Sequence, residues 1–501
     1  MELDARATPD GTTLDGDVCI VGAGPAGLTL ADALQRAGRQ VVLLESGGFD
    51  DDQAAQDLNA GIITGDLYHD PGLSRHSRVG GTPWTWNTFL GRETGAKYVP
   101  LDQIDFERRD WIPWSGWPFG RSVLDPYYRR AHDVCGLGPF DYAGLETGPG
   151  QPPFVELRGG RLGNAVYRFG SWRPFVIDLP ATLRAAPGVM LVPGAIVTGF
   201  QRDHSGERLG AVEWMALNGV RGMVRARVIV LATGGIENAR LLLALRDRNR
   251  AGHNGNDWLG RGFMEHPRDA SLELSSRARK LFAWHGFYAL RPTGSGQGVW
   301  GRIGLSEDLL RSDKLVNASV TLMPNTAARP RFPIPGLARL WARARALGPR
   351  TCPLLLNVEQ MPHPDNRVVL SERPDPLGRP GVELQWRWRA EDDAQLERIR
   401  ATVAREFRAA GLGRVRVVAK GPPDPNAYHP AGTTRMHVDP EQGVVDEHCR
   451  VYGVENLYVA GSSVFPTAGY ANPTLTIIAL ALRLADHLQA NLPGGAGASG
   501  G

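Results

Sequence analysis

The stretch that decides the fold is Asp17-Val-Cys-Ile-Val-Gly-Ala-Gly-Pro-Ala-Gly27. It begins as a short apolar run, typical of a buried strand, and ends in a Gly-x-Gly-x-x-Gly loop. Apolar residues at helical spacing follow over 28–37, and Gly38 is expected to end that helix. Gln40-Val-Val-Leu-Leu-Glu45 predicts a second strand. Together these segments form one βαβ unit, the expected start of a doubly wound sheet that binds a dinucleotide.

The glycines of this loop have separate roles. Gly22 permits the tight turn, and Gly24 lets backbone amides approach a pyrophosphate. Gly27 lets the helix pack closely on the sheet. Glu45 ends the second strand, where its carboxylate can accept hydrogen bonds from ribose hydroxyls. The fingerprint does not distinguish NAD from FAD.

Composition and charge exclude several classes of protein. The 501 residues are enough for two to three domains, and 56 basic against 53 acidic residues give no basic field for nucleic acid. The longest apolar run, around 475–482, is far shorter than the ~20 residues of a membrane span. The N-terminus lacks a signal pattern. The sequence contains no Cys-x-x-Cys pair, which would have indicated a metal site. We expect a reduced, cytoplasmic protein with no metal, nucleic-acid or membrane partner.

Five further motifs follow the fingerprint along the chain. They are Val79-Gly-Gly-Thr82 followed by Asn87; Ala232-Thr-Gly-Gly-Ile-Glu-Asn-Ala-Arg-Leu-Leu-Leu243; Gly260-Arg-Gly-Phe-Met-Glu-His-Pro267; His429-Pro-Ala-Gly-Thr433 with Arg435-Met436; and Gly461-Ser-Ser-Val-Phe-Pro-Thr467 with Ala471-Asn-Pro-Thr474. Their combination, which spans 17–487, resembles the glucose–methanol–choline (GMC) oxidoreductase family. Within it, the chain is most similar to the pyranose oxidase and glycoside oxidase branch.

The resemblance implies FAD as cofactor and the oxidation of an alcohol by hydride transfer to flavin N5. It assigns His429 as the base and Asn472 as its partner. Histidine suits this role because its unperturbed pKa lies nearest neutrality. Thr85 stands where pyranose oxidases have the histidine that bonds covalently to flavin, so we expect non-covalent FAD. Trp84 and Trp86 either stack on a sugar or fill the core.

The expected FAD contacts lie in the glycine loops and at the strand ends. They are Gly22, Gly24, Ala26, Gly27, Glu45, Ser46, Gly80, Gly81, Thr82, Thr85, Trp86, Asn87, Val197, Thr233, Gly234, Gly461, Ser462, Asn472, Pro473 and Thr474. Of the other histidines near motifs, His266 is expected to be structural, and no chemistry is assigned to His437.

The expected architecture is α/β (α+β overall), with two domains. A Rossmann-like FAD-binding domain comprises 15–263 and 421–490, including the Trp-rich segment 60–130 as a cover over the flavin. Residues 264–420 alternate β-rich pieces with an amphipathic helix, which predicts a substrate-binding domain on an antiparallel sheet. The Gly/Ser-rich tail 491–501 is expected to be disordered.

The sequence leaves substrate and acceptor open. The expected substrate is a sugar, glycoside or aminoglycoside, and the electron acceptor is oxygen or another compound. A cationic aminosugar would favour acidic pocket residues, for which Glu359 and Asp365 are candidates; both are also ordinary surface or turn residues. The alternatives are a flavin-containing lyase without net redox chemistry and a silent flavin-binding scaffold. The segment 329–350, with six arginines and no acid, is either a lid or solvated insertion or a basic binding segment.

Overall fold

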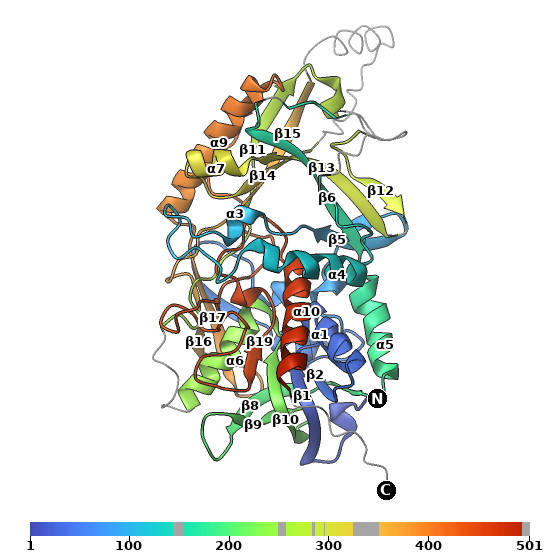
Figure 1. Cartoon of the computed structure of the whole chain (residues 1–501). Helices are drawn as coiled ribbons and strands as arrows, with labels where there is room; N and C mark the ends of the chain where they lie inside the picture. The colour runs from blue at the N-terminus through green and yellow to red at the C-terminus, as the bar shows by residue number, and fades with distance from the viewer. Residues whose placement is uncertain are drawn as a thin grey trace, which may run out of the picture.

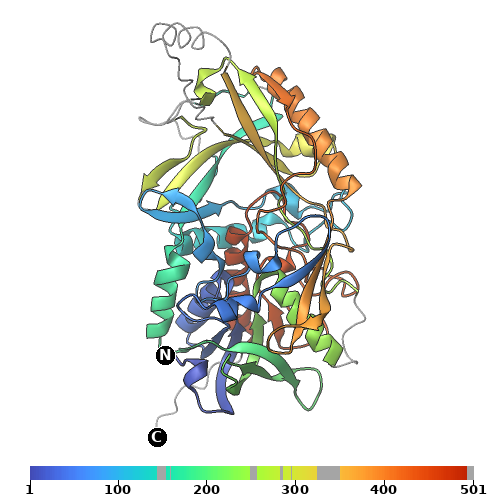
Figure 2. The same ribbon diagram turned by 180° about the vertical axis from the view of Figure 1, so that it is seen from behind.

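The structure is a computed structural model that describes residues 1–143, 154–157, 159–248, 257–282, 286–294, 296–323 and 350–492. Two large sheets occupy opposite ends of the molecule, and a small third sheet lies beside one of them (Figures 1 and 2). Most of the Arg-rich segment and the Gly/Ser-rich tail lie outside the described residues. None of the described helices is long and apolar enough to cross a bilayer.

The fingerprint forms the centre of a seven-stranded sheet. β1 (Thr12–Val21), α1 (Pro25–Arg36) and β2 (Val41–Glu45) make the expected βαβ unit. The last four residues of β1 and all of β2 are buried, as expected for parallel strands covered on both faces. The strand order is β7-β2-β1-β10-β9-β8, and β19 also pairs with β10. The added strands are β7 (Val189–Pro193), β8 (Ile196–Arg202), β9 (Leu209–Met215), β10 (Arg221–Leu231) and β19 (Leu457–Val459).

Strands from the two ends of the chain share this sheet. β1 pairs in parallel with β10, and β10 pairs in parallel with β19, through the partners Val21–Leu231 and Leu231–Val459. Segments about 440 residues apart in the sequence therefore lie in one sheet. The last helix, α10 (Thr474–Asn491), packs against α1 (Figure 1). The remaining helices of this half are α2 (Gln53–Asp57), α4 (Asp125–Cys135), α5 (Leu179–Ala185) and α6 (Gly234–Arg248).

The second large sheet is antiparallel, as expected, with nine strands in the order β18-β11-β15-β14-β13-β6-β5-β4 and β12 beside β13. α9 (Ala390–Ala409) covers it through a separate apolar core that includes Leu396, Ile399 and Val403. The other helices are α3 (Gln103–Phe106) and α7 (Glu307–Ser312). The strands are β4 (Thr88–Leu90), β5 (Glu93–Tyr98), β6 (Leu162–Ser171), β11 (Arg268–Ser276), β12 (Arg291–Gly294), β13 (Gln297–Leu305), β14 (Ala318–Leu322), β15 (Arg350–Val358) and β18 (Arg414–Val417).

Sheet membership differs from the domain limits expected from the sequence. β4, β5 and β6 fall inside the expected FAD-binding segment, yet they complete the antiparallel sheet, where β6 pairs with β13. Conversely, β16 (Arg367–Pro374) and β17 (Pro380–Trp386) leave that sheet and join β3 (Gly61–Gly65). Their apolar side chains belong to the same core as the seven-stranded sheet. The chain thus crosses between the two halves several times (Figure 2).

Candidate active site

A cavity of about 840 Å³ lies between the fingerprint loop and the face of the antiparallel sheet. Of the expected FAD contacts, all except Gly27 and Gly80 line it, and His429 and Asn472 line it as well. The structure therefore brings to one cavity residues from both ends of the chain. Gly27 and Gly80 lie behind the lining, where they allow backbone segments to approach each other.

Gly22, Gly24, Gly27 and Gly81 form a cradle whose close backbone approaches fit a dinucleotide. Gly22 has a φ of +105°, and a Cβ there would lie 2.7 Å from the Ala232 carbonyl oxygen. A Cβ on Gly27 would lie 1.9 Å from the Gly22 carbonyl oxygen, so α1 can sit this close to the loop only with glycine. A Cβ on Gly81 would lie 3.0 Å from Gly24 Cα. These close approaches leave the helix N-terminus open to the cavity, as phosphate binding requires.

Glu45 holds the shape of this cradle. Its buried carboxylate accepts hydrogen bonds from the backbone N–H of Ala23 at 2.8 Å and of Gly47 at 3.0 Å, and from the Ser46 hydroxyl. Burial raises the pKa of Glu45 above its ordinary value, although these hydrogen bonds oppose that shift. Glu45 also lines the cavity, where a ribose hydroxyl would lie in the expected assignment.

His429 and Asn472 form a hydrogen-bonded pair in the wall of the cavity. The Asn472 amide nitrogen lies 3.0 Å from His429 Nε2, so this ring nitrogen accepts the hydrogen bond and is unprotonated. Nδ1 of His429 is buried without a hydrogen-bond partner among the described residues. Burial lowers the pKa of His429 well below its ordinary value, and the positive charges of Lys97 and Arg268 lower it further. The ring is accordingly neutral at neutral pH.

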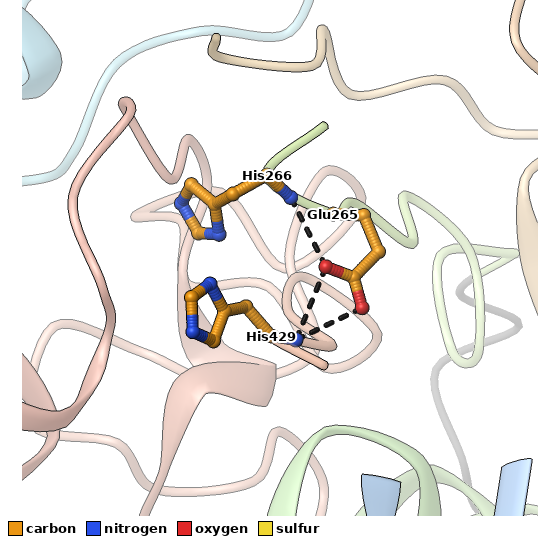
Figure 3. Close-up of side chains that lie close together, drawn as sticks. All are labelled: Glu265, His266 and His429. Carbon is orange, nitrogen blue, oxygen red and sulfur yellow. Dashed lines mark hydrogen bonds between the residues drawn. The ribbon is translucent and has the colours of Figure 1, made fainter. Parts of the chain in front are cut away.

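A buried glutamate, Glu265, fixes the backbone of this histidine (Figure 3). Its carboxylate accepts from the His429 N–H at 2.9 and 3.1 Å, from the His266 N–H at 3.1 Å, and from the Tyr68 hydroxyl at 2.6 Å. Burial raises the pKa of Glu265 to about 7. Sequence reasoning did not single out this residue, although the Glu-His-Pro motif contains it.

His266 forms part of the cavity wall beside His429, with the two ring centres 5.1 Å apart. Its Nε2 lies 3.0 Å from the Ala468 carbonyl oxygen, and burial lowers its pKa to about 4. Glu265, His266 and His429 place ligand-type atoms within 4.8 Å of one another. However, the Glu265 oxygens already accept four hydrogen bonds, and His266 Nε2 faces a carbonyl. Through these hydrogen bonds, Glu265 and His266 support the segment that carries His429.

The tryptophans that follow the Val79-Gly-Gly motif divide between wall and core. Trp86 lines the cavity and packs edge-on against Tyr98 and Phe175. Trp84 donates from Nε1 to the Val79 carbonyl and lies under the Arg78 guanidinium at 3.3 Å. Trp84 therefore supports the loop and is not among the cavity-lining residues. Thr85 lines the cavity, with its hydroxyl donating to the Thr82 carbonyl.

The two acidic candidates for binding a cationic sugar do not reach the cavity. Glu359 is buried in a bidentate ion pair with Arg109 at 2.6 and 2.8 Å, and it also accepts from the Asn317 N–H. The Asp365 side chain is 63 % exposed, near Arg389 and His363. Neither is among the residues that line the cavity, which favours the alternative that both have ordinary structural roles. A contact such as Arg109–Glu359, between residues 250 positions apart, leaves no local signal in the sequence.

Two family models match parts of this chain, and several known proteins resemble it over nearly its whole length. Residues 17–134 match the family model described as FAD dependent oxidoreductase, and residues 362–481 match that of GMC oxidoreductase. The fructose dehydrogenase large subunit of Gluconobacter japonicus is 25 % identical, over 96 % of this chain and 99 % of its own length. The 6'''-hydroxyparomomycin C oxidase of Streptomyces lividus is 27 % identical, over 95 % and 92 %.

Solved structures share the fold. A formate oxidase from Aspergillus oryzae superposes with a TM-score of 0.57 over 96 % of this chain and 99 % of its own, at 18 % identity. The relatives are named as oxidases and dehydrogenases, which gives the lyase alternative no support. The chain is an FAD-dependent oxidoreductase, and its residues 362–481 match the GMC oxidoreductase family model.

Proposed function

We propose that the protein oxidises an alcohol group of a carbohydrate-like substrate to a carbonyl, with His429 as the base and Asn472 as the residue that orients the hydroxyl. FAD, when bound, would supply the two-electron acceptor for the hydride that leaves the carbinol carbon. The observation that carries the proposal is the His429–Asn472 pair, in the same cavity as the dinucleotide cradle. The names of the relatives support a carbohydrate-like substrate.

His429 suits the role of base because its Nε2 is unprotonated and lines the cavity. As the hydroxyl approaches, Nε2 exchanges its hydrogen bond with Asn472 for one with the substrate and then takes the proton. A positioned base of this kind contributes ~10²–10⁴-fold to the rate. Glu265 holds the His429 backbone through two hydrogen bonds and so limits the movement of the ring.

Asn472 orients the hydroxyl without competing for the proton, because an amide does not ionise near neutrality. The helix α10 begins two residues later, at Thr474, and both residues line the cavity. The free N–H groups of its first turn favour negative charge nearby. FAD would be held by the fingerprint loop, Glu45, the 79–87 loop and the 461–474 segment.

The function is tested by mixing the FAD-loaded protein without oxygen with a panel of monosaccharides, glycosides and aminoglycosides. Bleaching of the flavin band by at least one of them is the expected result. Unchanged flavin with a cleaved product would favour a lyase, and unchanged flavin without product would favour a silent scaffold. Admission of air after bleaching then separates an oxidase, which regains colour at once, from a dehydrogenase, which needs another acceptor.

A further inference from the structure

The side of the cavity that the antiparallel sheet forms, which we call the roof, contains an ammonium group without an anionic partner. Lys97, on β5, lines the cavity, and its Nζ lies 4.3 Å from the centre of the Tyr167 ring. In the part of the chain that the structure describes, the Lys97 ammonium makes no hydrogen bond or ion pair, whereas its backbone pairs with β6. Lys97 is half-buried, and a charge that is largely withdrawn from water is costly unless a counter-ion meets it.

The other charged side chains of the cavity are already paired. The acidic ones, Glu45 and Glu237, accept from backbone amides and from arginines, respectively. The basic pairs are Arg75–Glu237 at 3.0 Å, Arg268–Asp424 at 2.7 Å and Arg379–Asp375 at 2.7 Å. Of the charged residues described along the cavity, Lys97 is thus the one left to bind a ligand.

The roof around Lys97 has an excess of positive charge. Tyr167 lies between Lys97 and the buried Arg302, whose guanidinium carbon is 5.4 Å from the ring centre. Burial raises the pKa of Tyr167, but these two cations outweigh it and hold the pKa below its ordinary value. The Tyr167 hydroxyl is itself occupied, because Thr321 and Asn357 donate to it and Ser319 lies 2.5 Å away. It is therefore not free to neutralise Lys97.

The position of Lys97 points to the substrate rather than to the FAD phosphates. The phosphate cradle is formed by β1 and α1, whereas Lys97 belongs to the antiparallel sheet on the opposite side of the cavity. Its charge also acts on His429, where it contributes to lowering the pKa of that ring. An anion paired with Lys97 would lie on the roof, within reach of the reacting end of the cavity.

We propose, on the basis of the function proposed above, that the substrate is an alcohol bearing a carboxylate, such as a sugar acid or uronide, and that this carboxylate pairs with Lys97. One unpaired cation matches one negative charge, so a carboxylate suits it better than a doubly charged phosphate. A cationic aminosugar is disfavoured, because its ammonium would meet Lys97 and no free carboxylate.

The anion site is tested with ligands that cannot be oxidised. Benzoate, and benzamide as its neutral counterpart, are titrated into the FAD-loaded protein while the flavin spectrum is followed. Benzoate should bind more tightly than benzamide, and Lys97→Met should raise the benzoate Kd by about tenfold to a hundredfold, as expected for one charge-assisted hydrogen bond. Lys97→Arg should retain most of the preference. Lys420→Met, at an exposed position, should bind like the wild type.

Several results would overturn the proposal. They are no benzoate binding at millimolar concentration, equal binding of both ligands, and unchanged benzoate binding in Lys97→Met. A shift in flavin reduction potential in that variant, with benzoate binding intact, would assign Lys97 to the flavin instead. If Lys97→Met loses FAD, Lys97→Gln serves the same test.

Oxidation rates separate this proposal from the function on which it rests. Methyl glucuronide should reduce the flavin faster than methyl glucoside at equal subsaturating concentration, and methyl glucosaminide should be slowest. Faster reduction by glucose 6-phosphate than by the glucuronide would contradict the choice of carboxylate. If benzoate binds through Lys97 but no polyol reduces the flavin, the proposed oxidation fails and the anion site stands. If neutral polyols reduce the flavin and benzoate does not bind, the proposed oxidation stands and the anion site fails.

Discussion

Replacing Glu265 by Gln should change how the stability of the protein depends on pH. The side chain is fully buried beneath His429, where its carboxylate accepts from two backbone amides and the Tyr68 hydroxyl. Burial raises its pKa from 4.5 to about 7, so desolvation outweighs those hydrogen bonds. Gln has almost the same shape and cannot titrate.

The magnitude and the sign follow from this pKa. Below pH 4.5 the carboxyl is protonated in both the native and the unfolded states. Between pH 4.5 and about 7 the unfolded chain releases the proton and the native protein keeps it, so rising pH favours unfolding. At ~1.4 kcal/mol per pKa unit, this one group lowers the free energy of unfolding by about 3 kcal/mol across that window. Above pH 7 the loss is complete and constant.

The assay is urea denaturation of the FAD-loaded wild type and Glu265→Gln at several pH values from 5 to 8. The stability difference, wild type minus variant, should fall as pH rises, and it should level off above about pH 7. Taking the difference cancels the titration of groups that the two proteins share. Glu441→Gln, at an exposed turn, controls for replacing a glutamate. Parallel curves for wild type and Glu265→Gln would refute the reasoning, and a difference that rises with pH would show that the hydrogen bonds outweigh burial.

Three further predictions concern the cofactor and the reacting pair. Gly27→Ala should abolish FAD retention on gel filtration, since the new Cβ would lie 1.9 Å from the Gly22 carbonyl oxygen; full retention would contradict the tight packing of helix on loop. Acid precipitation should release the flavin into the supernatant, because Thr85 offers no ring nitrogen for a covalent bond, and colour in the pellet would disprove this. Asn472→Ala should slow flavin reduction by about tenfold to a hundredfold with FAD still bound, because orientation is lost while the base remains; an unchanged rate would remove Asn472 from the site.

The sequence predicted the parts of the fold that depend on local pattern. The apolar run before Gly22 and the Gly-x-Gly-x-x-Gly spacing identify a parallel strand, a phosphate loop and a helix within 30 residues. The partners of short strands cannot be found this way. β5 and β6 were expected in the wrong half because their pairing depends on distant residues: β6 pairs with β13, more than 100 positions further along the chain, and β5 pairs with β6, at least 70 positions further along.

In the candidate site, too, residues marked by sequence motifs were predicted, and residues whose roles depend on distant contacts were not. His429 and Asn472 were identified through family motifs, and the structure brings their side chains to 3.0 Å. Glu265 was missed because its role depends on the hydrogen bonds that it accepts from His429, 164 positions further along the chain. Lys97 was missed because a lysine in a short strand gives no sign that its ammonium will line a cavity without a partner.

The central claim is tested most directly by the anaerobic rate of flavin reduction in His429→Ala, measured by stopped flow with the most reactive polyol of the panel. FAD content is verified first, and His437→Ala, which replaces a histidine outside the cavity, serves as the matched control. The account predicts that His429→Ala retains FAD but is reduced ~10²–10⁴-fold more slowly than the wild type, whereas His437→Ala is reduced at the wild-type rate. Near-wild-type reduction of His429→Ala would contradict the assignment of the base and, with it, the proposed mechanism.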